Sequence, residues 1–312
     1  MKQTNSSNPI SASRRDIGEQ QSMEGVRPAA GRGQSRRPWP LIAMENTLFL
    51  DPSLGWAERC AAIAEAGFAG VHAVPYPLKD DDFIRLRELG REPARHGLRL
   101  TSVYVNIDLA LPAESEAHRR VERLFRETEG APRIELSFKC SDPACLPVQV
   151  WDVILSRLEP LLKIAEQRGV DVALYPHSFY PLETPAEAAR LVQQVGHPRL
   201  SYLFPTNHVF AVQEPSEVAS RLAAHASAIS SFNVCGCRRA TPGPRAKPVS
   251  LPLDEGDLTL APVFSALAAG GYSGDVIVQG HLWKDDLPGK LRRSVSFYSE
   301  ITRNLFPVDD PA

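Results

Sequence analysis

The chain has 312 residues, 43% of them apolar and 23% charged, so it can bury a large core. Its formal net charge of -2 gives no basic footprint for nucleic acid or for an anionic membrane surface. No stretch reaches the roughly 18 to 20 consecutive apolar residues of a membrane helix. Five cysteines spread along the chain argue against a disulfide framework. We expect a protein of the reducing cytoplasm.

The first 38 residues are rich in Ser, Gln, Gly, Arg and Pro and have almost no apolar periodicity. This composition predicts a disordered tail over residues 1–38, followed by one domain over residues 39–312. Neither arginine pair of the tail is followed by the apolar region of an export signal. We expect the tail to be dispensable for the stability of the rest.

From Leu41 onward one unit recurs, a short apolar strand, a loop and an amphipathic helix. The pattern predicts strands over residues 41–49, 70–76, 98–108, 133–140, 170–177, 200–208, 228–236 and 275–281. It predicts helices over residues 54–68, 83–97, 116–130, 151–165, 184–196, 215–227, 262–272 and 290–306. Eight such units let a parallel sheet close on itself, so the predicted fold is α/β, a single (β/α)8 TIM barrel.

An open doubly wound sheet is the alternative fold. No glycine-rich phosphate loop follows any of the predicted strands, so the nucleotide-binding signature of that fold is absent. Within the predicted helix 151–165, Leu155, Leu158 and Leu162 keep the spacing of a core-facing stripe, and Pro160 predicts a kink.

Two successive strands each deliver a histidine at the carboxyl end. GVDVALYPH ends at His177, and LSYLFPTNH ends at His208. In parallel α/β sheets and barrels, ligands bind at this end of the strands. One such histidine alone would more simply be a loop residue held by water or backbone, but two at equivalent positions are candidates for acid–base chemistry.

The other strand ends add a polar collar. Alternate residues of a strand share a face, so Gln279 lies with His281, and Tyr175 with His177. Further residues at strand ends are Glu45, His72, Tyr104, Asn106, Lys139, Asn207, Asn233 and Cys235. Any one of them could instead satisfy backbone groups in a loop.

The segment 237–252 is a long loop with Arg238, Arg239, Arg245 and Lys247. Loops of this length are usually functional or mobile. Its cations could clamp a phosphate or carboxylate of a substrate, or could belong to a solvated lid without a partner.

Four segments carry a resemblance to a known family: GVDVALYPH, HPRLSYLFPTNH, ISSFNVCG and PLDEGDLTLAPVFSALAAGGYSGDVIVQGH. The series resembles strands five to eight of the xylose isomerase-like TIM barrels, the sugar-phosphate isomerase/epimerase group. The resemblance extends from about Leu41 to Phe306. It is most specific in the spacing of Leu253, Gly256, Phe264, Ala266, Leu267, Gly271, Tyr272 and Gly274.

The resemblance implies one divalent cation held by carboxylates and a histidine on strands five to eight. By position, those ligands fall on Tyr175, Pro205, Asn233 and Gln279. None of these is a carboxylate or an imidazole, so no metal is expected in the usual place. A zinc or manganese ion elsewhere stays open, for example a three-histidine zinc site of His177, His208 and His281.

We therefore expect an isomerase or epimerase that moves a proton on the carbon next to a carbonyl, in a sugar, sugar phosphate or related hydroxyketone. His177 and His208 are the candidates for base and acid, Lys139 for holding an oxyanion, and Glu45 for orienting a histidine. The candidates for substrate binding are His72, Asn106, Tyr175, Asn207, Asn233, Gln279, His281 and Arg238.

Two other functions stay open. A non-catalytic barrel could serve as a binding or scaffold subunit, which the replaced metal ligands suggest. A metal-independent lyase or cyclase could use the same two histidines on a non-sugar metabolite. The expected partner is a small-molecule substrate, with no nucleic acid and no membrane, and a homo-oligomer is left open.

Overall fold

A computed structural model describes residues 38–45, 54–75, 78–79, 89–142, 150–243 and 245–307. The predicted tail lies outside this part of the chain except for Pro38. The second half of the first predicted strand and the first half of the predicted helix 83–97 also lie largely outside it.

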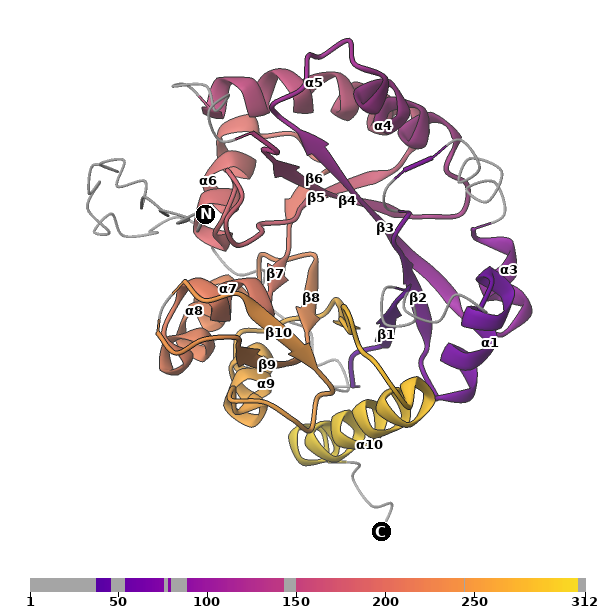
Figure 1. Ribbon diagram of the computed structural model, residues 1–312, viewed down its shortest axis with the longest axis vertical. Coiled ribbons are helices and arrows are strands. Elements are labelled where there is room, and N and C mark those ends of the chain that lie inside the picture. Colours follow the sequence, from indigo (N-terminus) through magenta and orange to yellow (C-terminus); the bar gives the residue numbers. More distant parts are fainter. Residues whose placement is uncertain are drawn as a thin grey trace, which may run out of the picture. The chain divides into compact units, whose positions relative to one another are not determined.

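The strands form a parallel barrel with helices around its outside (Figure 1). They are β1 (Leu41–Met44), β2 (Gly70–Ala73), β3 (Arg99–Asp108), β4 (Arg133–Lys139), β5 (Asp171–Leu174), β6 (Leu200–Tyr202), β7 (Phe204–Pro205), β8 (Ser231–Val234) and β11 (Asp275–Val278). Strands β6 and β7 are two halves of one strand that is interrupted at Leu203. The first half pairs with β5 and the second with β8, so the sheet closes. The predicted eight-fold barrel is confirmed.

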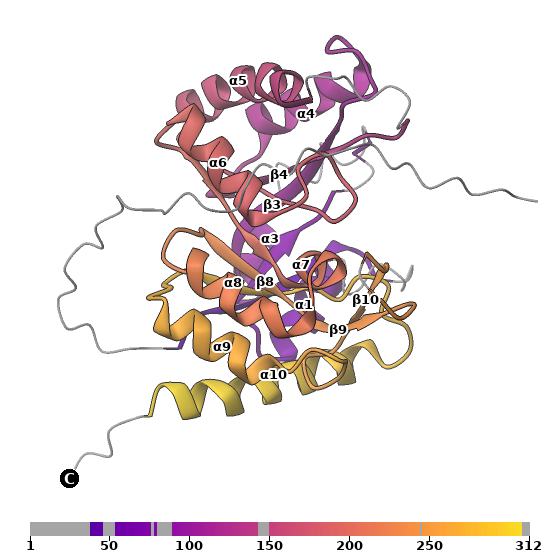
Figure 2. The same cartoon turned by 90° about the vertical axis from the view of Figure 1, so that its left-hand side faces the viewer.

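The helices are α1 (Trp56–Glu65), α3 (Arg91–Arg95), α4 (Glu116–Glu127), α5 (Val150–Arg168), α6 (Pro185–Val195), α7 (Thr206–Val212), α8 (Val218–His225), α9 (Leu260–Ala269) and α10 (Leu287–Leu305). A 3-10 turn, η3 (Pro215–Glu217), precedes α8. Helices α4 and α5 lie together on one side of the barrel, and α9 and α10 lie on the opposite side (Figure 2). Among the described helices, none is long and apolar enough to cross a membrane.

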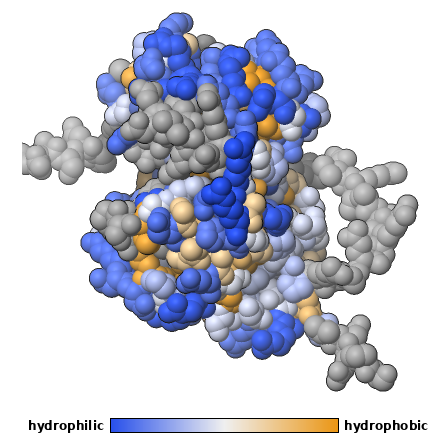
Figure 3. Space-filling view, turned by 90° about the vertical axis from the view of Figure 1, so that its right-hand side faces the viewer, coloured by the Kyte–Doolittle hydropathy of each residue, from blue (hydrophilic) through white to orange (hydrophobic). Residues whose placement is uncertain are grey.

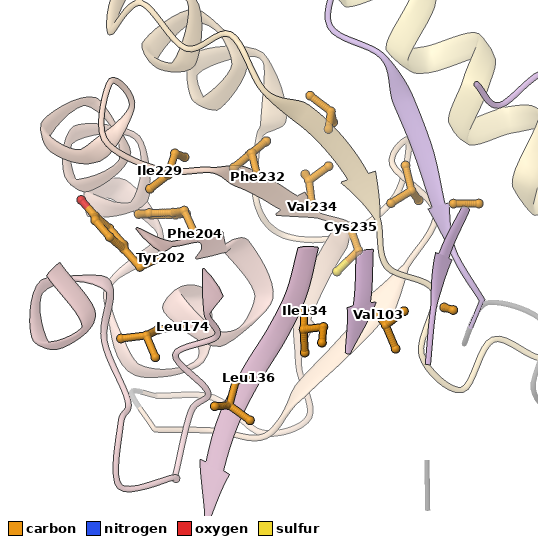
Figure 4. Close-up of a cluster of buried hydrophobic side chains, with 14 of the residues drawn as sticks. Val103, Ile134, Leu136, Leu174, Tyr202, Phe204, Ile229, Phe232, Val234 and Cys235 are labelled. Atoms are coloured by element: carbon orange, nitrogen blue, oxygen red, sulfur yellow. The ribbon is translucent and has the colours of Figure 1, made fainter. Parts of the chain in front are cut away.

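The side chains of the strands build two separate cores. Alternation along β1 sends Ile42 and Met44 into the barrel, and Leu41 and Ala43 outward. The inner core consists of Ile42, Met44, Val74, Ala173, Tyr175, Leu203 and Ile277. The outer core lies between strands and helices, and Figure 4 shows part of it, including Val103, Ile134, Leu174, Phe204 and Phe232.

Helix α6 shows why its sequence starts and stops where it does. The Thr184 hydroxyl accepts from the Glu187 N–H, and the Glu187 carboxylate accepts from the Thr184 N–H, which completes a capping box. Gly196 ends the helix with a φ of 62°, a conformation that favours glycine. The loop that carries His177 therefore runs directly into a firmly capped helix.

Two predicted elements differ from the structure. The predicted strand 200–208 ends at Pro205, and α7 begins at Thr206, so His208 lies in the first turn of a helix. Proline has no backbone N–H for a ladder, which favours the end of the strand there. The predicted loop 237–252 contains an antiparallel hairpin, β9 (Gly236–Arg239) and β10 (Pro248–Leu251), that packs beside α7 (Figure 2).

The surface is mostly hydrophilic on the face in Figure 3, with hydrophobic residues in small patches. Large hydrophobic side chains exposed in the described ranges are Leu111, Phe179, Val249 and Leu282. Three of them follow strands of the second half of the barrel or lie in the β9–β10 hairpin. Apolar side chains are thus exposed near the carboxyl ends of the strands.

Replacing Leu158 by alanine should lower the free energy of unfolding by about 2 to 5 kcal/mol, because this side chain is only 1% exposed on α5. Chemical denaturation measures the loss. Gln167→Ala, at an exposed position of the same helix, is the control and should change stability by less than about 0.5 kcal/mol. Equal losses in the two variants would contradict this packing.

Candidate functional site

A compact turn after β5 carries His177. The His177 N–H donates to the Leu182 carbonyl at 2.9 Å, and the Tyr180 N–H donates to the His177 carbonyl at 3.0 Å. Phe179, between them, has a φ of 69°, in the left-handed region that few residues other than glycine adopt. Such strain persists where surrounding contacts fix it, and it is most common at functional sites.

His208 reaches the same place from the first turn of α7. Its ring and that of His177 have centroids 3.7 Å apart and planes tilted by 35°. Tyr180 also stacks on His177, at 3.8 Å and 17°, so the His177 ring lies between the two. The rings of Tyr175 and His208 pack in a T-shaped arrangement, with their centroids 5.6 Å apart. The predicted pairing of the two histidines is therefore a direct ring contact.

Ser178 binds both histidines. The Nδ1 atom of His177 lies 2.8 Å from the Ser178 carbonyl, and because a carbonyl only accepts, this nitrogen carries the proton. The Nδ1 atom of His208 lies 2.9 Å from the Ser178 hydroxyl, which can donate to it or accept from it. In the described part of the chain, neither Nε2 atom makes a hydrogen bond. His177 thus presents a lone pair at Nε2.

Both histidines are neutral at pH 7. Burial lowers the pKa of His177 to about 4, and the nearby His281 adds to the shift. Burial also lowers the pKa of His208 well below its ordinary value, with His177 and His281 contributing. Two positive charges on imidazoles in ring contact repel each other strongly. The pair is therefore suited to take up one additional proton, but not two.

Below the histidines, Tyr175 and Gln279 form a second polar pair. The Tyr175 hydroxyl donates to Gln279 Oε1 at 3.2 Å, and its ring packs edge-on against Tyr104 at 5.0 Å. Burial raises the pKa of Tyr175 well above 10, so it stays protonated. The amide of Asn233 lies beside it, and neither the nitrogen nor the oxygen of that amide has a hydrogen-bond partner among the described residues.

Two other predicted residues, Glu45 and His72, contact charged side chains of the barrel itself. One oxygen of Glu45 accepts from Arg59 at 2.9 Å, and the other accepts from the Val74 N–H at 3.0 Å. His72 is fully buried inside the barrel, 3.6 Å from Glu135. Burial lowers the pKa of His72, although Glu135 opposes the shift. These contacts tie β1, β2 and β4 together.

The remaining predicted residues are spread around the strand ends. Lys139 pairs with Asp108 at 3.7 Å where β4 and β3 end. Asn207 is buried in α7 beside His208, and its Oδ1 has no partner in the described ranges. Asn106 is half-buried on β3, and Arg238 is exposed on β9. Partial burial and the charge of Lys247 lower the pKa of His281.

Sequence reasoning missed Ser178, Tyr180 and Glu183. All three follow His177 within six residues, yet they lie in a turn whose conformation no periodicity reveals. Glu183 accepts two hydrogen bonds from Arg245, at 3.1 and 3.0 Å, so this arginine of the long loop holds a protein carboxylate. Arg239 likewise donates to the carbonyl of Phe210 on α7.

The positions at which the family resemblance implies metal ligands do not fit a divalent cation. Pro205 has no donor atom, and Tyr175 keeps its proton and donates it to Gln279. Asn233 and Gln279 carry no charge to repay the dehydration of Mg²⁺ or Mn²⁺. Across the described ranges, no three His, Cys, Asp or Glu side chains are grouped so that they could hold a metal ion.

A cavity of about 580 Å³ lies at the other end of the barrel. Its lining includes Leu98 and Arg99 at the start of β3, and Asp275 at the start of β11. Arg99 and Asp275 form an ion pair at 3.1 Å there. The amino ends of barrel strands usually serve stability, so the cavity is not the candidate site.

A family described as Xylose isomerase-like TIM barrel matches residues 60–300. The chain belongs to this family. No curated protein matches the chain.

Several solved structures share the xylose isomerase-like fold with this chain. The 3-keto-D-glucoside 4-epimerase YcjR from E. coli is 17% identical, has a TM-score of 0.63, and the match covers 84% of this chain and 99% of that one. The D-psicose 3-epimerase from Clostridium cellulolyticum H10 is 18% identical, with a TM-score of 0.61 and coverages of 86% and 100%. A xylose isomerase domain protein from Salmonella typhimurium LT2 is 16% identical, with a TM-score of 0.65 and coverages of 86% and 100%.

The stability of the protein should fall as the pH is lowered from about 6.5 to about 4. The first value is the ordinary pKa of histidine, and the second is the pKa of His177 in the folded protein. In this window the unfolded chain binds a proton at His177 and the folded protein does not, so acid favours unfolding by up to about 3 kcal/mol. His177→Gln removes this proton uptake and should flatten the decline. Denaturant titrations at several pH values measure it, and parallel curves for both proteins would contradict the neutral state of His177.

Proposed function

We propose that this protein isomerises a small sugar or related hydroxyketone by proton transfer, with His177 as base and His208 as acid. The observation that carries the proposal is the ring contact of two neutral imidazoles whose partner, Ser178, gives them different roles. A scaffold subunit has no need of such a pair. Two proteins with the same fold are named as sugar epimerases, which agrees with this substrate class.

In the proposed reaction, the Nε2 lone pair of His177 takes a proton from the carbon next to the carbonyl. The electron pair of that C–H bond moves into the new carbon–carbon double bond, and the carbonyl oxygen takes a proton from His208 Nε2. This requires the Ser178 hydroxyl to donate to His208 Nδ1, which leaves the proton on Nε2. The side-chain nitrogen of Gln279 can donate to a substrate oxygen, because Tyr175 donates to the side-chain oxygen Oε1 and leaves the nitrogen available.

The stacked geometry favours aldose–ketose isomerisation over epimerisation by two bases. Removal and return of a proton on opposite faces of one carbon needs bases on both sides of the substrate. Rings 3.7 Å apart approach a substrate from one side. His177 can return the proton to the neighbouring carbon on that same face, while the hydroxyl on the first carbon gives its proton to the anionic His208 and becomes the new carbonyl. The proposal includes no metal, because Tyr175, Asn233 and Gln279 do not supply the charge that such an ion requires.

Incubation with aldoses and ketoses in deuterated water tests the assignment. The wild-type protein should incorporate deuterium at the carbon next to the carbonyl, which NMR detects. His177→Gln and His208→Gln should each lower the rate by about 10² to 10⁴-fold, the usual contribution of an acid or base. His197→Gln, at the end of α6, is the control and should keep the wild-type rate. Full activity in His177→Gln would reject the proposed mechanism.

Treatment with a strong chelator should leave the rate of exchange unchanged. The reason is that the positions of the usual metal ligands hold no carboxylate and no imidazole. Metal content is measured on the same samples. Stoichiometric zinc or manganese that leaves together with the activity would contradict the metal-free reaction.

A further inference from the structure

A single peptide group links His177 to a buried carboxylate. The carbonyl of Ser178 accepts the Nδ1 proton of His177 at 2.8 Å. The N–H of Phe179 donates to Glu183 Oε1, also at 2.8 Å. This carbonyl and this N–H belong to the same planar peptide unit, so its two polar ends are both held. His177 and Glu183 are thus the two ends of one hydrogen-bonded chain.

The carboxylate of Glu183 is itself fixed from the hairpin. Glu183 is only 3% exposed, and Arg245, between β9 and β10, donates to both of its carboxylate oxygens. Two parallel bonds of this kind fix direction as well as distance. The guanidinium also lies 5.5 Å from the centre of the Phe179 ring. Phe179 and Arg245 both have positive φ, 69° and 58°, so these contacts hold two strained residues.

The same hairpin reaches the other polar pair of the site. The Ser250 hydroxyl donates to the backbone carbonyl of Gln279 at 2.6 Å, and Arg239 donates to the backbone carbonyl of Phe210 on α7 at 3.1 Å. The hairpin therefore contacts the segments that carry His177, His208 and Gln279. A shift of the hairpin would therefore change the contacts of all three segments.

We propose that Glu183 and Arg245 are positioning residues for His177 and act on it through the peptide group between Ser178 and Phe179. The proposal rests on the function proposed above, in which His177 is the base. A carboxylate at the N–H end polarises the peptide and makes its carbonyl a stronger acceptor. That carbonyl then holds the proton on Nδ1 and favours the uptake of a second proton at Nε2. Arg245 orients Glu183 and partly offsets its charge.

The two charges predict opposite effects on the proton affinity of His177. Glu183→Gln keeps the shape and an acceptor for Phe179 but removes the negative charge, so the proton affinity should fall about three- to tenfold. Arg245→Met removes the positive charge, so the affinity should rise by a similar factor. If these residues only held the turn in place, both changes would admit water, and the affinity would rise in both variants.

NMR titration of 15N-histidine-labelled protein from pH 2.5 to 8 measures this affinity, with the His177 signal assigned from His177→Gln. Arg123→Met is the matched control, because Arg123 also bonds both oxygens of a glutamate, Glu127, on the distant α4. The control should titrate as the wild type. A rise in the proton affinity of Glu183→Gln, or no change, overturns the relay.

Arg245→Lys provides the test if Glu183→Gln does not fold. It keeps the charge and loses the two-point grip, so the relay predicts a proton affinity within about twofold of wild type, against the rise in Arg245→Met. Equal rises in both would mean that the turn only loosens. These readings need no substrate. Loss of the proposed function, shown by full exchange activity in His177→Gln, would leave the titration result standing.

Discussion

The site depends on the ring contact between His177 and His208. At a centroid distance of 3.7 Å in a buried environment, a charge on one imidazole strongly disfavours a charge on the other. The resting pair is therefore neutral. A neutral imidazole is both a base and a hydrogen-bond donor, which one carboxylate is not. The contact thus supplies the two functions that proton transfer next to a carbonyl requires.

The barrel makes this contact through two local features. The strand that contains β6 and β7 ends at Pro205, and the chain turns at once into α7, which brings His208 over the end of β5. On the other side, the turn after β5 is closed by the His177 N–H and by the capped start of α6. Aromatic packing by Tyr180 then fixes the His177 ring. Backbone geometry and ring packing therefore hold the two imidazoles in contact.

The sequence was sufficient to predict the barrel and to single out the two histidines whose rings meet at the strand ends. Eight repeats of strand and helix, and the apolar stripe of α5, follow from periodicity, because burial of one face enforces it. Leu158 and Leu162 are buried as predicted, and Leu155 is half-buried. Glu45 and His72 are predicted site residues because they end strands. Their partners, Arg59 and Glu135, could be found only in three dimensions.

The turn at residues 177–183 and the hairpin of Arg245 were beyond sequence reasoning for a different physical reason. The left-handed conformations of Phe179 and Arg245 oppose local preference and are stabilised by contacts between distant segments. Arg245 and Arg238 have the same composition signal and are both exposed, yet of these two only Arg245 contacts a carboxylate in the described part of the chain. Composition predicted that the loop is cationic. Only the folded structure shows that Arg245 contacts the turn that carries His177.

The proton position on His177 tests the central claim most directly. A long-range 1H–15N spectrum of 15N-histidine-labelled protein at pH 7 distinguishes the two neutral tautomers and the charged ring. We predict a neutral His177 with its proton on Nδ1 and a free lone pair on Nε2, because the Ser178 carbonyl can only accept. A proton on Nε2, or a charged imidazole at pH 7, would contradict the assignment of His177 as the base.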